Sequence, residues 1–394
     1  MLDPDRIRSR FPALQEIGPT GLPVIHADAP GGTQAVDTAI ERIAGHLREG
    51  SANQHGAFAV SQRVDRLVAR VRGQVAGFLG TEPDSVVFGP NMTTLTIHLA
   101  RALEARIGPD DAIACTRLDH DANVSPWLTL AARTGATVRF IDLDPTTGRL
   151  DLDTLDAAIG PDTKLVTFPG ASNSLGTIVD PEPLVTAARA VGAWTFLDAV
   201  HLAPHAPLDR RAMGVDVLAC SAYKFFGPHA GLLAADPALL ADLTPDKLRP
   251  APDTGPDRWQ TGTASFEAIA GIGGAIEYLD DIGMDAIATH ESALIERFLD
   301  GVAPLRHVQL HGPAEATGRT PTFAVTLDGL TPTSVAEAFA AHGINVWAGH
   351  YYALEPMRAL GLLDAGGAVR IGFAHYHRAD DVDRVLEVLA DLTR

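Results

Sequence analysis

Short strand-like runs alternate with amphipathic, helix-like segments between about residue 80 and residue 235. The strand-like runs lie at 85–89, 112–116, 137–143, 164–170, 194–200 and 217–223, and the helix-like segments at 92–107, 124–135, 152–159 and 183–192. This alternation is typical of a largely parallel β-sheet with helices on both faces, the α/β class. Because such sheets bind ligands at the carboxyl ends of their strands, we expect functional residues directly after these runs.

The pattern changes after about residue 265. Two long helices are predicted at 266–283 and 285–302, followed by shorter elements at 307–312, 322–329, 335–343, 344–349, 368–376 and 382–393. A chain of 394 residues is also too long for one ordinary core. We therefore expect a large α/β domain at 21–284 and a small α+β domain formed by 1–20 and 285–394.

Composition and charge restrict the environment and the partners. The chain is 46% hydrophobic and 20% charged and lacks an apolar run long enough for a membrane span or a signal core, so we expect a cytoplasmic protein. A formal net charge of −18 opposes binding to nucleic acid. Cys115 and Cys220 both lie in apolar runs, which favours buried structural thiols and a reducing compartment.

Lys224 follows the apolar run 217–219 within SAYKFFGP, where Gly227 and Pro228 oppose a following helix. A lysine at a strand end is partly buried, and burial lowers its pKa towards that of a neutral, nucleophilic amine. Such a lysine can form a Schiff base. The alternative is an exposed lysine on a loop.

Two polar clusters follow earlier strands. In FGPNMTTLT a helix is expected to begin near Thr93, where amides and hydroxyls offer a phosphate site; the alternative is a simple threonine cap. His120 follows the run 112–116 and is placed to stack on an aromatic ring or to move protons. The surrounding DHD is a poor match to a metal site, and we expect no metal.

Asp198 ends a strand of apolar residues and is costly to bury unless it meets a cation or a proton donor. The alternatives are a turn cap or an ion pair with arginine. An acid such as Asp198 that pairs with a ring nitrogen and a lysine such as Lys224 that reacts with an aldehyde are the two main protein groups of a pyridoxal phosphate site. His201 and His205 have the spacing of metal ligands on a helix, but Pro204 opposes a regular helix there. The glycines of AGIGGAIEYL fit close helix packing better than a dinucleotide-binding motif.

At these residues the chain resembles the class V, fold-type I pyridoxal phosphate enzymes, in particular the branch of cysteine desulfurases, selenocysteine lyases and isopenicillin N epimerase-like proteins. The resemblance covers nearly the whole chain. The matching residues are 92–94, His120 with 122–123 and 126–127, 172–173 before 175–177, Asp198, the SAYKFFGP block, 262–263, 349–350 and Arg370.

The resemblance implies the fold, a mostly parallel seven-stranded-type sheet with a small α+β domain, and a role for each matching residue. Lys224 would be the Schiff-base residue, Asp198 would keep the pyridine nitrogen protonated, and His120 would stack on the ring, which makes these three the expected catalytic residues. The other expected cofactor contacts are Asn173 and His201 to the phenolic oxygen, with Thr93, Thr94, Ser221, Tyr223 and, from a neighbouring subunit, Thr263 to the phosphate. The expected working unit is therefore a homodimer.

On the substrate side, the resemblance assigns Arg370 to the carboxylate of an α-amino acid, with His350 and Tyr352 nearby. A guanidinium fork suits a carboxylate, although taken alone Arg370 also fits a strand-end salt bridge. The chain departs from the desulfurases in three places. Tyr223 replaces the usual histidine, a conservative exchange of donors. His201 stands where they carry glutamine, and Tyr352 stands where they carry the cysteine that forms a persulfide. Tyr352 then either shapes the pocket, donates a proton, or simply packs.

We therefore expect a pyridoxal phosphate enzyme that acts on an α-amino acid through an external aldimine and a Cα carbanion. Elimination of a β-substituent, with cleavage of a C–S bond, is the first hypothesis. Epimerisation and transamination are the alternatives within the same fold, and a pyridoxal-binding protein without turnover is the alternative outside enzymes.

Overall fold

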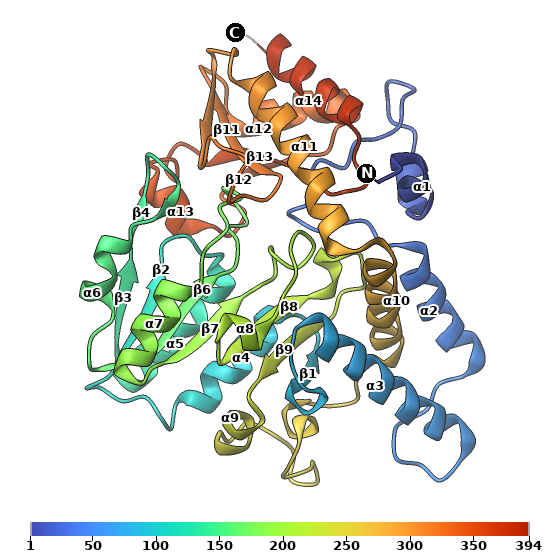
Figure 1. Ribbon diagram of the computed structural model, residues 1–394, viewed down its shortest axis with the longest axis vertical. Helices are drawn as coiled ribbons and strands as arrows, with labels where there is room; N and C mark the ends of the chain where they lie inside the picture. Colours follow the sequence, from blue (N-terminus) through green and yellow to red (C-terminus); the bar gives the residue numbers. More distant parts are fainter. Residues whose placement is uncertain (1, 393–394) are drawn as a thin grey trace.

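A computed structural model describes residues 2–392. A seven-stranded sheet with the strand order β1-β9-β8-β7-β6-β2-β3 forms the centre of the larger part of the molecule (Figure 1). Its strands are β1 (Val86–Gly89), β2 (Ala112–Thr116), β3 (Thr137–Ile141), β6 (Thr163–Pro169), β7 (Trp194–Asp198), β8 (Val217–Ser221) and β9 (Gly231–Ala235). The five strands from β3 to β8 in this order are parallel. This confirms the expected α/β class and the mostly parallel sheet.

Strand β9 is the exception in direction, because it pairs antiparallel with both β8 and β1. The sequence patterns did not predict it, since the glycines and the proline between residues 227 and 231 suggested only a turn. The turn is real, but it is tight enough for the chain to return beside β8, where Gly231 pairs with Ser221.

Helices cover both faces of this sheet, each with its own core. One core joins the strands to α3, α7 and α10 and includes Leu197, Leu218 and Leu232. The other joins them to α4, α5 and α9 and includes Phe196 and Leu233. Side chains thus alternate between faces along β7 and β9, as the pleat of a strand requires. The helices of this part are α2 (Asp37–Glu49), α3 (Ala59–Phe78), α4 (Met92–Leu103), α5 (Ser125–Thr134), α6 (Leu155–Ala158), α7 (Glu182–Val191), α8 (Arg210–Met213), α9 (Pro237–Asp242) and α10 (Phe266–Ile282).

A four-stranded antiparallel sheet, ordered β10-β11-β13-β12, forms the centre of the smaller part. Its elements are α11 (Met284–Val302), β10 (Val308–His311), β11 (Thr322–Leu327), α12 (Pro332–Ala341), β12 (Trp347–Gly349), α13 (Leu354–Ala359), β13 (Ala368–Gly372) and α14 (Ala379–Asp391). A short hairpin of β4 (Leu143–Asp144) and β5 (Arg149–Leu150) lies beside α13.

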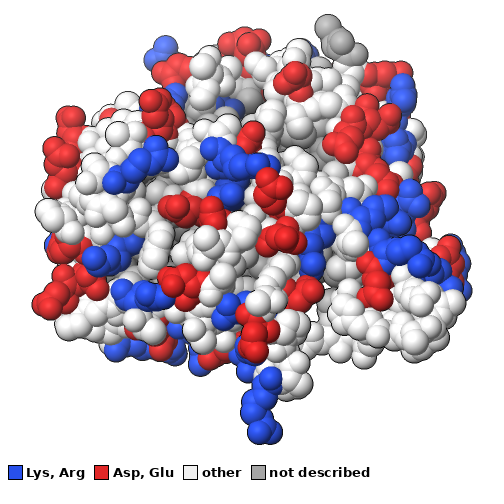
Figure 2. Space-filling model, turned by 60° about the horizontal axis from the view of Figure 1, so that its bottom comes forward, with Lys and Arg blue, Asp and Glu red and all other residues white. Residues whose placement is uncertain are grey.

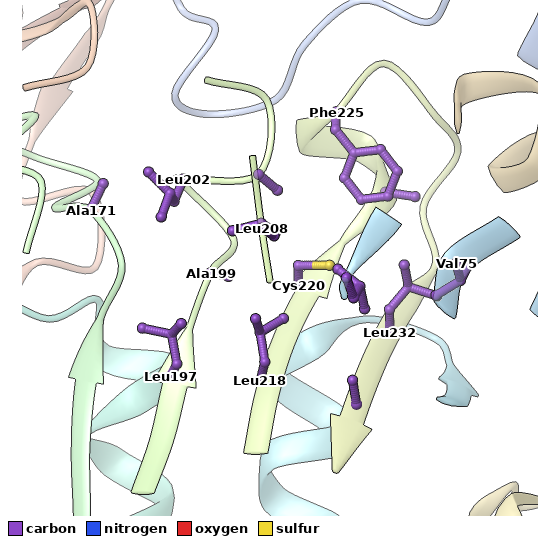
Figure 3. Packing of buried hydrophobic residues seen from close by; sticks show 14 of the residues in the cluster. Val75, Ala171, Leu197, Ala199, Leu202, Leu208, Leu218, Cys220, Phe225 and Leu232 are labelled. Atoms are coloured by element: carbon purple, nitrogen blue, oxygen red, sulfur yellow. The ribbon is translucent and has the colours of Figure 1, made fainter. Parts of the chain in front are cut away.

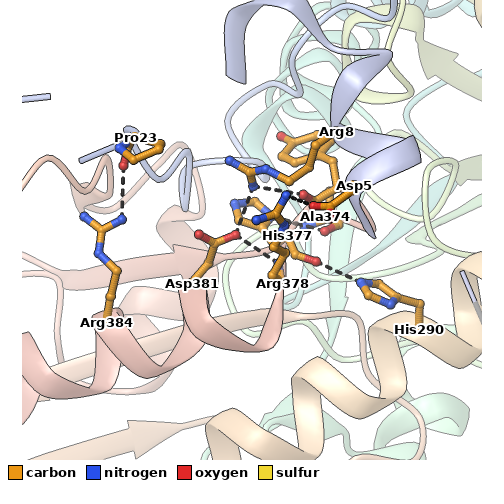
Figure 4. A network of polar contacts seen from close by, with 10 residues as sticks. Asp5, Arg8, Pro23, His290, Ala374, His377, Arg378, Asp381 and Arg384 are labelled. Atoms are coloured by element: carbon orange, nitrogen blue, oxygen red, sulfur yellow. Dashed lines mark hydrogen bonds and ion pairs between the residues drawn. The ribbon is translucent and has the colours of Figure 1, made fainter. Parts of the chain in front are cut away.

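The N-terminal segment packs against this smaller part. Helix α1 (Pro4–Ser9) is joined to α14 by Arg8, whose Nη1 lies 3.0 Å from Asp381 Oδ2 (Figure 4). Further along, Ile25 and Asp28 form β-bridges with Ile344 and Gly372. Gly283 separates α10 from α11, close to the boundary that we place between residues 284 and 285. The division at 1–20, 21–284 and 285–394 remains a proposal, and Met1 and residues 393–394 lie outside the described residues.

Helices α2 and α3 were not predicted, and α6 is shorter than the segment 152–159 suggested because a 3₁₀ turn occupies Leu152–Thr154. Among residues 2–392 no helix is both long and apolar enough to cross a bilayer. Acidic and basic side chains are interspersed over most of the face in Figure 2.

Candidate active site

Lys224 lies at the end of the 3₁₀ turn Ala222–Lys224, which directly follows β8. Its side chain is buried, and Nζ donates a hydrogen bond to the carbonyl of Pro30. Burial, together with the charge of Arg370, lowers the pKa of Lys224 from its usual value near 10.5 to about 7. The alternative of an exposed loop lysine is therefore wrong, and a large fraction of this amine is neutral near pH 7.

Asp198 ends β7, the strand that pairs with β8, so Asp198 and Lys224 follow neighbouring strand ends as expected. Asp198 is buried and accepts a 2.9 Å hydrogen bond from the amide of Val200, so it does cap the following turn. Burial raises the pKa of Asp198 to about 6, and the nearby charge of Lys224 opposes this rise. Among residues 2–392 no ion pair includes Asp198, which leaves its charge available to a bound cation.

The start of α4 is held against the end of β8. The amide of Met92 donates to Ser221 Oγ over 2.9 Å, and Asn91 caps the helix by accepting from the amide of Thr94 at 2.8 Å. The cap is thus Asn91 and not a threonine, so Thr93 and Thr94 remain exposed at the first turn. Gly231 is required here, because a Cβ on it would lie 2.3 Å from the backbone of Asn91.

A cavity of about 830 Å³ opens beside Lys224. Its wall includes eight of the predicted site residues, namely Thr93, His120, Asn173, Tyr223, Lys224, His350, Tyr352 and Arg370. Asp198, His201 and Ser221 are buried and do not form the wall. Thr94 is exposed at the start of α4, and Thr263 is exposed in the loop before α10, so neither of these two lies on the cavity wall of this chain.

Arg370 reaches the cavity from the middle of β13 and is buried. Its Nη1 donates to the carbonyl of Asn173 at 3.0 Å, and the guanidinium carbon lies 4.6 Å from the ring centre of Tyr351. None of the ion pairs among residues 2–392 includes Arg370, and its Nε is buried without a hydrogen-bond partner. The salt-bridge alternative is therefore wrong. Burial lowers its pKa to about 10, which still leaves a cation without a carboxylate partner.

His120 is neutral at physiological pH. Burial and the charges of Lys224 and Arg370 lower its pKa to about 3. Its Nδ1 accepts a 2.9 Å hydrogen bond from the amide of Ala122, so the ring proton lies on Nε2. The ring stacks on Tyr352 with the ring centres 5.6 Å apart and an interplanar angle of 27°.

His201 lies in the turn after β7, with its Nε2 2.9 Å from Thr322 Oγ1 and 3.2 Å from Thr320 Oγ1. Burial holds its pKa well below the usual value near 6.5. His205, which has metal-like spacing to His201, instead lies 2.8 Å from Glu291. Within residues 2–392 no three His, Cys, Asp or Glu side chains gather as metal ligands would.

A sequence model of the family described as "Aminotransferase class-V" matches residues 25–385. The chain belongs to this family. A probable cysteine desulfurase of Streptomyces coelicolor is 30% identical over 99% of this chain and 97% of that protein, and probable cysteine desulfurase 2 of Mycobacterium leprae is 30% identical over 98% and 95%. The apo structure of a cysteine desulfurase from Thermococcus onnurineus NA1 covers 100% of this chain and 98% of its own, with a TM-score of 0.93 and 27% identity.

Members of this class V family use pyridoxal phosphate, and the protein is a pyridoxal phosphate-dependent enzyme. The residues present fit that cofactor. A buried amine with a lowered pKa suits an aldehyde, and a buried carboxylate without a cation suits a pyridinium nitrogen. Asn173 Oδ1 is buried in the same region without a partner, and the exposed first turn of α4 offers donors for a phosphate.

In contrast, neither cysteine of this class V enzyme lies on the cavity wall. Cys115 belongs to β2 and Cys220 to β8, and both are fully buried. Figure 3 shows Cys220 among Leu218, Leu232 and Val75 in the core on one face of the sheet. Burial raises the pKa of Cys115 to about 12 and that of Cys220 further, so both thiols stay protonated. This confirms the expectation of buried thiols.

Several wall residues escaped the sequence analysis. Pro30 and Gly31 come from a loop far from the predicted strand ends, and Trp347 comes from β12. Tyr351 was also missed. It and the predicted Tyr352 have left-handed φ values of 43° and 59°, which is strained for aromatic residues and often marks a functional loop. The run APGG, whose two glycines let backbone approach a ligand closely, is the local signal by which the first loop could have been found.

Proposed function

We propose that this class V enzyme cleaves the bond between Cβ and sulfur of a cysteine-like amino acid by β-elimination, without a protein persulfide. The observation that carries the proposal is the position of the two thiols, which are buried in strands away from the cavity. The position expected to hold a reactive cysteine carries Tyr352, whose side chain is exposed at the cavity wall. The sulfur of the substrate is therefore released as a free thiol, or as sulfide from cysteine, and is not transferred to a protein cysteine.

Lys224 is the residue proposed to link the cofactor and to move the Cα proton. When bound, pyridoxal phosphate supplies an aldehyde that reacts with amines and a ring that withdraws electrons from Cα. Because the pKa of Lys224 is about 7, its amine takes up a proton readily at physiological pH. Asp198 is proposed to keep the ring nitrogen protonated, and neutral His120 to stack on the ring with its Nε2 proton available.

The remaining cofactor contacts are proposed from the resemblance to the family. Asn173 and His201 are assigned to the phenolic oxygen. Thr93, Thr94, Ser221 and Tyr223 are assigned to the phosphate, where the start of α4 meets the end of β8. By the same resemblance, Thr263 is assigned to the phosphate of a second copy, with a homodimer as the working unit; its position off the cavity wall of its own chain is compatible with this assignment.

Arg370 is proposed to bind the substrate carboxylate, because it is a buried cation without an acidic partner at the cavity wall. His350 and Tyr352 then lie around the β-substituent. In the reaction the Cα–H and Cβ–S bonds break, the proton goes to Lys224, and sulfur leaves with the bond's electron pair and takes up a proton. The released enamine consumes one water and gives a keto acid and ammonia.

The test is incubation of the holoenzyme with L-cysteine and with S-methyl-L-cysteine. We expect equal amounts of keto acid, ammonia and thiol (sulfide from L-cysteine), and no mass gain on the protein. Alanine as co-product, with a gain of one sulfur on Cys115 or Cys220, would establish desulfuration instead. Loss of chirality at Cα without cleavage would indicate epimerisation, and transfer of the amino group to a keto acid would indicate transamination.

A further inference from the structure

Three large apolar side chains are exposed on the wall of the catalytic cavity. Ile97 is 47% exposed, Trp347 53% and Tyr352 66%. Single exposed apolar residues are common on protein surfaces, but a group of them around one concave site marks a ligand contact. The wall of this cavity therefore offers more exposed apolar surface than a cysteine side chain needs.

Trp347 stands beside the proposed carboxylate site. It lies directly opposite Arg370 in the antiparallel pair of β12 and β13. Opposed residues of such a pair project from the same face of the sheet, with their Cβ atoms about 4.5–5.5 Å apart. The indole thus projects from the same face of the sheet as the guanidinium that is proposed to receive the carboxylate.

The indole is also held close to the reactive lysine. A Cβ on Gly31 would lie 2.5 Å from Trp347 Nε1, so the indole edge rests against the backbone of Gly31. The preceding residue, Pro30, accepts the hydrogen bond from Lys224 Nζ. Trp347 thus packs against the residue that follows Pro30, the hydrogen-bond acceptor of Lys224. Only glycine at position 31 permits this packing.

The cavity continues away from this centre along α4. Its wall follows one side of that helix from Thr93 through Ile97 to Glu104, which spans about 16 Å at 1.5 Å per residue. At the far end Glu104 pairs with Arg133 of α5, with 2.5 Å between Oε1 and Nη1. A volume of about 830 Å³ lies near the upper end of the range of roughly 300–1,000 Å³ that accommodates drug-sized ligands.

We infer that the substrate carries an aromatic or extended apolar group on its sulfur, and that Trp347 is the specificity-determining residue that contacts this group. The inference rests on the proposed function, because the group is attached through the Cβ–S bond that is cleaved. Arg370 fixes the carboxylate, Lys224 faces Cα, and the indole faces the substituent on sulfur. The preferred class is S-aryl, S-arylmethyl or long S-alkyl cysteines over cysteine itself.

The test separates binding from chemistry. Lys224→Ala protein, loaded with pyridoxal phosphate, is titrated calorimetrically with S-methyl-L-cysteine and S-benzyl-L-cysteine. We expect the benzyl compound to bind about tenfold more tightly, a typical effect of a modest apolar contact in a pocket. Addition of Trp347→Ala should abolish this preference, while Trp347→Phe should keep part of it. Leu128→Ala, which removes an exposed apolar side chain of α5 outside the wall, is the matched control and should leave the preference intact.

With Lys224 present, kcat/KM should show the same order of substrates and the same dependence on Trp347. Equal affinities for the two compounds, or a preference that survives Trp347→Ala, would overturn the inference. A benzyl preference without cleavage of either compound would refute the proposed function and support the apolar subsite. Equal cleavage of both compounds would support the proposed function and refute the subsite.

Discussion

The amide of Met92 donates a hydrogen bond to the hydroxyl of Ser221 over 2.9 Å, which joins the first residue of α4 to the last residue of β8. The backbone of Asn91 crosses Gly231 at the same place, with no room for a side chain. Gly231→Ala should therefore push α4 away from β8, lower the free energy of unfolding by about 1–3 kcal/mol, and weaken cofactor binding. Urea unfolding and cofactor titration measure the two effects.

Gly73→Ala is the control for this substitution. Gly73 lies within α3 with open space around its Cα, so alanine there should raise the free energy of unfolding by about 0.5–1 kcal/mol. Equal stability of the Gly231→Ala and Gly73→Ala proteins would contradict the close crossing.

The second prediction concerns covalent attachment of the cofactor. The chain contains three lysines, Lys164, Lys224 and Lys247. After borohydride reduction of the yellow holoenzyme, peptide mapping should find the cofactor on Lys224 alone, because it is the buried lysine with the lowered pKa. Lys224→Ala should lose the resting absorbance band and keep its fold, whereas Lys164→Ala should keep both. A modified Lys164 or Lys247 would refute the assignment.

The third prediction concerns the pH dependence of stability in the apoenzyme. Between the folded pKa of Lys224, about 7, and its usual value near 10.5, the unfolded chain binds one more proton than the folded chain. Stability therefore rises with pH across this window, by up to about 1.4 kcal/mol per pH unit from this one group. Lys224→Met should reduce this increase of the free energy of unfolding with pH, measured by urea unfolding between about pH 7.5 and about pH 9.5. Lys164→Met, at a half-exposed position, should leave the slope as in the parent protein.

Asp198→Asn should retain much of the cofactor and lower kcat by roughly 10²–10³-fold, as expected for the loss of a preorganised charge in a buried site. The amide is close in size to the carboxylate and can still accept from Val200, so the fold should persist. Steady-state kinetics on the best substrate, with circular dichroism as the check on folding, measure this effect. Turnover at the parent rate would refute the assignment of Asp198 to the ring nitrogen.

Replacement of both cysteines tests the route of the sulfur. Cys115→Ala/Cys220→Ala should cleave S-methyl-L-cysteine at a rate within about twofold of the parent, since neither thiol lies on the cavity wall. The double variant will be less stable, because each alanine leaves a small gap in a packed core. Loss of activity in a protein that remains folded would restore a role for one of the thiols.

The strand ends show what could be predicted from the sequence. Asp198 and Lys224 follow apolar runs whose periodicity and spacing indicate neighbouring parallel strands, and the structure places them so. His120 was also indicated by its position after a strand-like run, whereas Arg370 was found through the resemblance, which supplied roles that spacing alone did not. The class V family and its cofactor are confirmed, whereas the role of each site residue stays a prediction.

The features that were missed depend on contacts between distant segments. Trp347 faces the site because β12 pairs with β13, and Pro30 reaches Lys224 because the N-terminal segment bridges to residues 344 and 372. Neither of these contacts leaves a local pattern in the chain. The cap of α4 is different, because Asn91 accepts from the amide of Thr94 three residues away, a local signal that was overlooked in favour of a threonine cap.

The pairing of Ile25 with Ile344 and of Asp28 with Gly372 also bears on how the protein is made. A ribosome releases the N-terminal segment first, yet the partners of that segment emerge almost last. Strand β1 likewise has no partner until β9 has been translated. The loop that carries Pro30 therefore gains its last backbone partners only when synthesis is nearly finished, so a truncated nascent chain lacks part of the pocket wall until near the end of translation.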